Sequence, residues 1–413
     1  MIKYHMDDLS SHKGISSLML PDIRLAVISI AFFTFAGRAL AVVLAFQIYR
    51  ITHSPLALGW LGLVEAIPAV ATASFGGYVA DHFSRQAILK IARSVSFICS
   101  LILLLLSIGD PRSSIAWLYL MIFILGIARG FADPATTGFE AQVVPKHLTV
   151  NAASWFGSTW ILASIFGPGA IGFIFAEWGA PGSYGTIAAC FLISLVFFLL
   201  IPPKQQVMPE VRENVLKSIR TGWRALLKIQ PLFASMILDL FAVFFGGAVI
   251  LLPVYAIDIL KVGVRGLGLL NAAASLGALV TMLSATSHPP IKNAGRNLLW
   301  AVAGFGVSIL VFAFSTDFWL SFLALFLSGL FDGLSMIVRR SIMRLLSPDH
   351  LRGRIAAAGS IFICASNELG AFESGMLASL IGTVPCVAAG GVVTLLVVGM
   401  TAALSDQLRK LKF

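Results

Sequence analysis

Charged residues are scarce in this sequence of 413 residues. Asp, Glu, Lys and Arg make up 12% of the chain, whereas 58% of the residues are hydrophobic and the mean hydropathy is +0.92. Soluble domains carry about 25% charged residues, so this composition excludes a water-soluble globular protein. A spanning helix takes about 20 apolar residues, and the apolar runs leave room for short loops only. The sequence therefore predicts a multi-pass membrane protein without a large soluble domain.

Histidine and cysteine are also few. The 7 His and 4 Cys residues are scattered, without the spacing of metal sites or disulfide frameworks. The sequence has no HExxH, GxSxG or P-loop pattern, which argues against a membrane-embedded enzyme and against ATP-driven transport by this chain. We therefore expect no enzymatic activity, no metal and no cofactor.

Apolar runs, separated by charged residues, Gly or Pro, predict twelve spanning helices and an all-α membrane fold. The first six spans are 24–49, 56–80, 87–108, 115–138, 149–176 and 184–201; the second six are 231–257, 266–287, 297–314, 318–340, 355–380 and 385–404. The polar stretch 1–23 has neither the apolar region nor the cleavage site of a secretory signal. We expect it to stay in the cytoplasm.

Basic residues are distributed unevenly between the two sides that this topology defines. With a cytoplasmic amino terminus, 23 of the 29 Lys and Arg residues fall on the cytoplasmic side and 4 on the outside. The positive-inside rule describes this bias, so the net charge of +10 reports orientation and gives no reason to expect nucleic-acid binding. The same orientation places the tail 405–413 in the cytoplasm.

One longer polar segment, 202–230, divides the predicted spans into two sets of six. Its prolines break helix, and 211–229 then mixes basic and apolar residues at near-helical spacing. We expect a helix on the inner membrane surface that links the two halves; gating or sensing of anionic lipid is the alternative. The predicted domains are two six-helix bundles, 24–201 and 231–404.

The two halves are related in sequence. At an offset of 203 residues, six identities align: Gly126 with Gly329, Gly130 with Gly333, Pro145 with Pro348, His147 with His350, Leu148 with Leu351 and Ala153 with Ala356. At an offset of 209, the stretch beginning Leu58-Gly59 aligns with that beginning Leu267-Gly268. Transporters built from repeats place their substrate between the repeats near the bilayer midplane, so the duplication favours a carrier.

Several ionisable residues fall inside predicted spans, where a charge costs several kcal/mol unless it is paired or faces water. They are Arg38, Glu65, Arg129, Asp133, Asp239, Asp332 and Glu368. We predict that one of the four acids Glu65, Asp133, Asp239 and Glu368 carries a proton coupled to transport. The alternative is a structural role as hydrogen-bonded polar groups.

Arg129 has two candidate partners. Asp133 lies four residues further along the same helix face, which predicts a local ion pair. Asp332 occupies the repeat position equivalent to Arg129, which predicts a pair across the pseudo-symmetry axis. The sequence leaves both open.

Three arginines, Arg339, Arg340 and Arg344, lie at the predicted cytoplasmic end of the span 318–340. Long basic side chains near helix ends reach toward lipid headgroups, and we expect that role for all three. Attraction of an anionic substrate is the alternative.

The loop after the second predicted span resembles the signature of the major facilitator superfamily. It reads Gly76-Gly77-Tyr78-Val79-Ala80-Asp81-His82-Phe83-Ser84-Arg85-Gln86, in which Gly77, Asp81 and Arg85 match and His82, Ser84 and Gln86 depart from the pattern. We expect Gly77 to let two helices approach closely and Asp81 to pair with Arg85. The three residues would form a cytoplasmic latch of an outward-facing state.

Two further stretches carry a resemblance. Gly167-Pro168-Gly169-Ala170-Ile171-Gly172 resembles the Gly-Pro antiporter motif of the superfamily's exporters, with Ile171 where one Gly is expected. Most of the chain resembles the enterobactin-exporter-like branch, through Gln47-Ile48-Tyr49, Thr52-His53-Ser54, Pro55-Leu56-Ala57-Leu58-Gly59, Arg352-Gly353-Arg354, Ala365-Ser366-Asn367-Glu368-Leu369-Gly370 and Phe372-Glu373-Ser374-Gly375.

The resemblance implies a bacterial inner-membrane exporter of siderophores or other amphiphilic small molecules, driven by a proton gradient. Its partners would be the small-molecule substrate, protons and membrane lipid, and a monomer is the expected state. Import of a siderophore or lipid-like solute and broad multidrug efflux are alternatives that the same fold allows.

Overall fold

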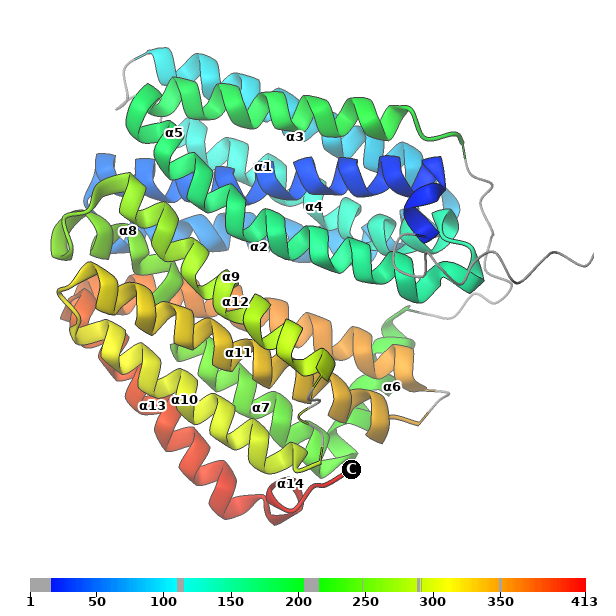
Figure 1. Ribbon diagram of the computed structural model, residues 1–413, viewed down its shortest axis with the longest axis vertical. Coiled ribbons are helices and arrows are strands. Elements are labelled where there is room, and N and C mark those ends of the chain that lie inside the picture. Colours follow the sequence, from blue (N-terminus) through cyan, green and yellow to red (C-terminus); the bar gives the residue numbers. More distant parts are fainter. Residues whose placement is uncertain are drawn as a thin grey trace, which may run out of the picture. The chain divides into compact units, whose positions relative to one another are not determined.

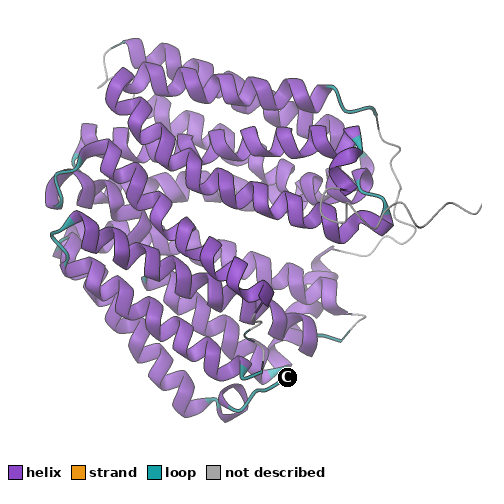
Figure 2. Ribbon diagram, viewed as in Figure 1, coloured by secondary structure: helices purple, strands orange, loops and turns teal. Residues whose placement is uncertain are grey.

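The protein is helical throughout the part of the chain that the structure describes. The computed structural model describes residues 16–109, 115–203, 215–246, 248–287, 290, 292–348 and 351–413, and these contain helices and connecting loops but no strand (Figures 1 and 2). Ten helical segments in these ranges are long and apolar enough to cross a membrane. The prediction of an all-α membrane fold is confirmed.

The long helices follow the predicted spans. In the first half they are α1 (Pro21–Thr52), α2 (Pro55–His82), α3 (Arg85–Ile108), α4 (Ile115–Val143) and α5 (Thr149–Leu199). In the second half they are α7 (Gln230–Phe245), α9 (Gly263–Ser287), α10 (Ala294–Phe314), α11 (Phe318–Leu346), α12 (Arg352–Ile381) and α13 (Thr383–Leu404). The shorter elements are η1 (Ser16–Met19), η3 (Lys146–Leu148), α6 (Val215–Lys228), η4 (Ala248–Leu251), α8 (Leu252–Val254), the π-helical η5 (Tyr255–Ile259) and α14 (Asp406–Arg409).

α5 contains two of the predicted spans. Gly179 interrupts it with φ of +64°, a left-handed conformation that glycine adopts without steric cost. The interruption lies between the predicted spans 149–176 and 184–201, so the sequence placed this turn correctly. The total number of membrane crossings and their orientation stay predictions.

α7 is shorter than predicted. The predicted span 231–257 corresponds to α7 up to Phe245, and after Gly246 the chain continues as the short elements η4, α8 and η5. Gly246-Gly247 has low helix propensity, and Pro253 has no N–H to donate to the preceding turn. A π-helical turn inside a spanning segment is rare, and the apolar pattern alone gave no sign of it.

Contacts group the described chain into two compact units. The first comprises Met1–Ala41, Ile67–Gly167 and Trp178–Glu210; the second comprises Val42–Ala66, Pro168–Glu177 and Val211–Phe413. The second unit therefore includes one end each of α1 and α2 and the middle of α5. These bounds differ from 24–201 and 231–404, so the predicted division into two six-helix bundles stays a prediction.

Two glycines of the sequence repeat pack against equivalent residues in the two halves. In the first unit, Gly130 of α4 packs against Ala69 and Thr72 of α2, and in the second unit Gly333 of α11 packs against Ala278 and Thr281 of α9. Ala278 and Thr281 are the equivalents of Ala69 and Thr72 at the offset of 209 residues. Small residues let helices approach closely in membranes. The pair α2 and α4 uses them in the first half, and the equivalent pair α9 and α11 uses them in the second.

Gly329 supplies a direct test of this packing. A Cβ added at Gly329 of α11 would overlap the carbonyl group of Ala274 in α9, whereas a Cβ at Gly399 of α13 would meet nothing within 4 Å. We expect Gly329→Ala to lower the stability by about 1–3 kcal/mol through overpacking. Gly399→Ala should be neutral or stabilising by about 0.5–1 kcal/mol, because Ala favours helix. Unfolding in detergent measures both, and equal effects would contradict the packing described.

Arg93 corrects one detail of the charge count. It is one of the 23 basic residues counted on the cytoplasmic side, but it lies inside α3 and is only 4% exposed. Its Nε donates to the hydroxyl of Ser29 at 3.3 Å, and its guanidinium lies 4.0 Å from the ring centroid of Phe198. A buried arginine needs such polar and aromatic contacts, so Arg93 belongs to the interior of the first unit.

Candidate functional site

A buried ion pair joins α7 to α11 in the second unit. Asp239 of α7 accepts from the guanidinium of Arg339 of α11, and their side chains are only 6% and 14% exposed. Both residues lie in segments that are apolar enough to span the membrane. The ion pairs Arg129–Asp133, Arg265–Glu177 and Arg409–Asp406 are far more exposed than this pair.

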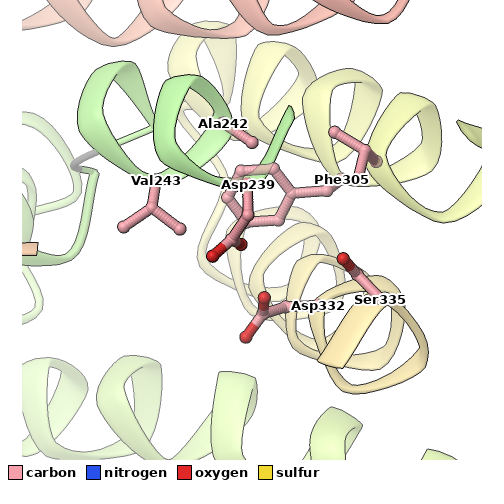
Figure 3. A pocket seen from close by; sticks show the side chains of 7 residues that line it. Asp239, Ala242, Val243, Phe305, Asp332 and Ser335 are labelled. Atoms are coloured by element: carbon pink, nitrogen blue, oxygen red, sulfur yellow. The ribbon is translucent and has the colours of Figure 1, made fainter. Parts of the chain in front are cut away.

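A second acid lies beside this pair. Asp332 of α11 and Asp239 line the same small cavity, where their carboxylates extend into one space between α7 and α11 (Figure 3). The cavity measures about 10 Å³, which is about the room that one water molecule requires. Its lining residues are Asp239, Ala242, Val243, Val302, Phe305, Asp332 and Ser335. Two carboxylates and the Ser335 side chain are thus set among apolar lining residues, and the guanidinium of Arg339 pairs with one of the carboxylates.

The spacing along α11 explains how these groups meet. Asp332, Ser335 and Arg339 are separated by three and four residues, so they share one face of the helix. The Oγ of Ser335 and the Nε of Arg339 are buried and have no hydrogen-bond partner among the described residues. Buried polar groups are normally paired. Here a hydroxyl group and a guanidinium N–H remain available to donate hydrogen bonds beside the two acids.

The charge of this cluster depends on one proton. With both carboxylates ionised, the three residues carry a net charge of −1, and with one proton bound they are neutral. A net charge within a membrane span is costly unless it is compensated or hydrated. Because the two carboxylates and the arginine interact closely, a proton belongs to the cluster as a whole. The arrangement can bind and release a proton between two helices.

The expected role of Arg339 at the lipid surface is wrong. Its guanidinium turns inward to Asp239 and is mostly buried, whereas the next residue, Arg340, is exposed. The reason is the helix period, which separates neighbouring residues by about 100°. The spacing of Asp332 and Arg339 places both on one face of the helix. This spacing could have indicated from the sequence that Arg339 turns toward the acids, but it was not used.

Arg129 and Asp133 form the local pair predicted for α4. Arg129 Nε lies 3.5 Å from Asp133 Oδ2, and the side chains are 43% and 70% exposed. Asp332 belongs to the other unit, so its pairing with Arg129 stays a prediction. Exposed charges within a predicted span require water rather than lipid at that surface. This face of α4 therefore suits a hydrated path better than a lipid contact.

Arg38 is exposed in the middle of α1. Its guanidinium lies 4.9 Å from the ring centroid of Trp160 of α5, which is itself 48% exposed. An arginine over an aromatic face makes a cation–π contact. The two side chains give the first unit a second exposed polar surface within its spans.

Glu65 of α2 and Glu368 of α12 are half-buried, and each makes polar or electrostatic interactions. Glu65 is therefore not an isolated acid. Gly62 of α2 packs against Ala371 and against the Glu368 side chain, which places Glu368 at a helix contact within the second unit. Neither acid lines the cavity of Asp239 and Asp332.

The loop signature differs in its glycine from the expectation. A Cβ at Gly77 would meet nothing within 4 Å, whereas one at Gly76 would overlap the Gly130 carbonyl of α4. Gly76, not Gly77, is therefore the close-approach glycine. Arg85 donates to the carbonyl oxygens of Ala80 at 3.2 Å and Gly138 at 3.1 Å, so it ties the start of α3 to α2 and α4. The side chain of Asp81 lies outside the described residues, and its latch with Arg85 stays a prediction.

The Gly-Pro stretch in α5 contains two close-approach positions. A Cβ at Gly167 would lie 2.9 Å from the carbonyl oxygen of Phe35 in α1, and one at Gly172 would lie 2.7 Å from that of Val264 in α9. The carbonyl of Pro168 in turn lies against Gly268 of α9. These glycines allow close helix packing; their role in antiport stays a prediction.

Comparison with known proteins gives one consistent result. The family model of the Major Facilitator Superfamily matches residues 27–291. The enterobactin exporter EntS of Citrobacter koseri is 26% identical over 385 residues, covering 90% of this chain and 89% of that protein. EntS of Shigella flexneri is 25% identical over 361 residues, covering 87% and 86%.

Solved transporter structures share the fold. A crystal structure of a peptide transporter POT matches with a TM-score of 0.76 at 12% sequence identity, covering 95% of each chain. The xylose transporter XylE from E. coli, in an inward-open conformation, matches with a TM-score of 0.70 at 14% identity, covering 94% of this chain and 98% of that one. At such low identity these structures establish the architecture and not the cargo.

Proposed function

Because the chain belongs to the Major Facilitator Superfamily, we propose that it exports an amphiphilic small molecule, of the siderophore class, in exchange for protons. The family match and the similarity to EntS make it a secondary transporter of the bacterial inner membrane, and a transport protein rather than an enzyme. Direction, coupling ion and cargo are the proposed part.

The cluster of Asp239, Arg339 and Asp332 carries the proposal of proton coupling. Proton binding neutralises the cluster, and proton release leaves a net negative charge in apolar surroundings. Asp239 belongs to α7, whereas Arg339 and Asp332 belong to α11. A change in the charge of the cluster would therefore alter the attraction between these two helices, and with it the relative stability of two transport states.

The cargo class rests on the relatives and on the exposed charges of the first unit. The relatives' name specifies export of enterobactin, and the match covers nearly the whole of both chains. Arg38 beside Trp160, and Arg129 beside Asp133, combine charge and aromatic surface within spans. Such a surface suits a solute with polar and aromatic parts.

Transport by purified protein tests the proposal. We expect proteoliposomes with an imposed pH gradient to accumulate a siderophore while protons move in the opposite direction, both recorded in the same vesicles. Lipophilic cations serve as comparison cargo, and transport of these in preference to siderophores would indicate multidrug efflux. Movement of cargo and protons in the same direction would indicate an importer and overturn the exporter assignment. Substrate flux without proton flux would remove the coupling role of the cluster.

A further inference from the structure

An open groove lies between α10 and α13, away from the acidic cluster. It measures about 470 Å³, within the range of roughly 300–1,000 Å³ that is common for small-molecule sites. Its lining residues are Arg296, Leu299, Trp300, Ala303, Val398, Ala402 and Arg409. Apolar side chains form the walls, and the charge is confined to two arginines.

The two arginines come together at one end of the groove. Arg296 lies in the first turn of α10, and Arg409 belongs to α14, just after the end of α13. Trp300 lies one turn further into α10 and is 64% exposed. The charged end of the groove therefore coincides with the ends of the spanning helices, where lipid headgroups lie and Trp is common.

The carboxyl-terminal segment is packed so that Arg409 stays at this position. Leu408 is fully buried, and its carbonyl lies against Gly295 at the start of α10. The backbone N–H of Gly295 donates to the carbonyl oxygen of Leu411 at 3.2 Å. α14 is thus fixed against the first turn of α10, which holds Arg409 near Arg296.

The surrounding charge is predominantly positive. Lys292, Lys410 and Lys412 follow or flank the two arginines and are exposed. Asp406 is the one carboxylate of α14; it pairs with Arg409, and Lys410 Nζ lies 2.5 Å from its Oδ2. Arg296 makes no ion pair with a residue that the structure describes. An anion at this end of the groove would therefore find a cation that is free to bind it.

We propose that this groove binds one anionic phospholipid, with its phosphate between Arg296 and Arg409 and part of an acyl chain along the apolar walls. Guanidinium groups recognise phosphate through paired hydrogen bonds, and the apolar walls match the acyl chain. The charge bias of the sequence assigns this end to the cytoplasmic side, whose leaflet attracts basic residues through its anionic lipids. The groove shares no lining residue with the cavity of Asp239 and Asp332.

Trp300 provides the measurement. The full-length protein is reconstituted in phosphatidylcholine vesicles with increasing amounts of phosphatidylglycerol whose acyl chains carry bromine, which quenches nearby tryptophan. The difference between wild type and Trp300→Phe isolates the signal of Trp300 from that of the other Trp residues. We expect quenching at a lower mole fraction of brominated phosphatidylglycerol than of brominated phosphatidylcholine.

The two arginines should account for this preference. Each basic residue near the membrane surface contributes about a fivefold gain for anionic lipid, so Arg296→Gln with Arg409→Gln should weaken the preference by about 25-fold. The matched control, Lys292→Gln with Lys412→Gln, removes the same charge outside the groove and should leave the preference nearly unchanged. Arg296→Gln alone should weaken it about fivefold and serves if the double variant does not insert. Ala402→Leu, which fills the groove, should reduce quenching by both lipids.

Three results would overturn the proposal. Equal quenching by the two lipids in wild type would show that the groove does not select an anionic lipid. An equal loss of preference in the lysine control would assign the effect to diffuse surface charge. Loss of the preference in micromolar inorganic phosphate, but not in chloride of the same ionic strength, would assign the arginines to a soluble anion instead of a lipid.

Discussion

Asp239→Asn should abolish uphill transport driven by a pH gradient while leaving counterflow exchange of the cargo intact. The substitution keeps the shape of the side chain and removes the carboxylate that pairs with Arg339. Without it, the cluster cannot alternate between a protonated and a deprotonated form at this position. Accumulation against a gradient requires that alternation, whereas exchange of cargo down its own gradient does not. Asp332→Asn should have the same effect, because both acids share one cavity.

Asp317→Asn is the matched control. Asp317 caps the start of the same helix, α11, and its side chain accepts from the backbone N–H of Leu320 at 2.8 Å. Asn caps helices about as well as Asp, so this variant removes one carboxylate without loss of the cap and should transport normally. Retention of uphill transport in both Asp239→Asn and Asp332→Asn would contradict the assignment of coupling to this cluster. Glu65, Asp133 and Glu368 would then be the remaining candidates.

Arg339→Met should cause the largest loss of stability. Removing one member of a buried ion pair leaves the other uncompensated, which costs about 3–5 kcal/mol. In this protein the loss affects two carboxylates, Asp239 and Asp332, that line one small cavity. Met approximates the apolar part of the arginine side chain. The expected loss of stability therefore reflects the missing charge more than a change in side-chain volume. Unfolding in detergent at neutral pH gives the measurement.

The neighbouring residue supplies the control for Arg339. Arg340→Met changes an exposed arginine on the same helix and should alter the stability by no more than about 0.5 kcal/mol. The double variant Asp239→Asn with Arg339→Met removes both partners of the ion pair and should recover most of the loss, because mutations of contacting residues are not additive. Additive losses in the double variant would show that the pair does not contribute as a unit.

Much of the architecture was predictable because membrane insertion imposes a strong constraint on composition. A spanning helix must satisfy its backbone hydrogen bonds internally and expose apolar side chains to lipid, so the predicted spans fall on helices, except where 231–257 is interrupted after Phe245. The gap between the predicted spans 149–176 and 184–201 correctly indicated a turn inside α5, and the structure places it at Gly179. The offsets that relate the two halves in sequence also hold in the packing, since Gly130 and Gly333 contact equivalent residues.

Other features depend on contacts that no local pattern specifies. Gly76 and Gly77 are adjacent in the sequence, and only the position of α4 decides which of them allows close approach. The break after α7 follows from Gly246-Gly247 and Pro253 inside a run that is apolar throughout. The apolar signal that predicts spans does not distinguish a continuous helix from an interrupted one.

The distinction is clearest at the acidic cluster. Composition and apolar runs determined that this chain is a helical membrane protein and that Asp239 and Asp332 require compensation within the membrane, and identities at fixed offsets showed that its halves are related in sequence. Which partner provides that compensation was decided by the packing of α7 against α11, which turned Arg339 inward to Asp239 and left Arg340 exposed. The sequence shows that a charged residue lies inside an apolar span and therefore needs a partner. That partner lies on a helix distant in the chain, and tertiary contacts decide which residue it is.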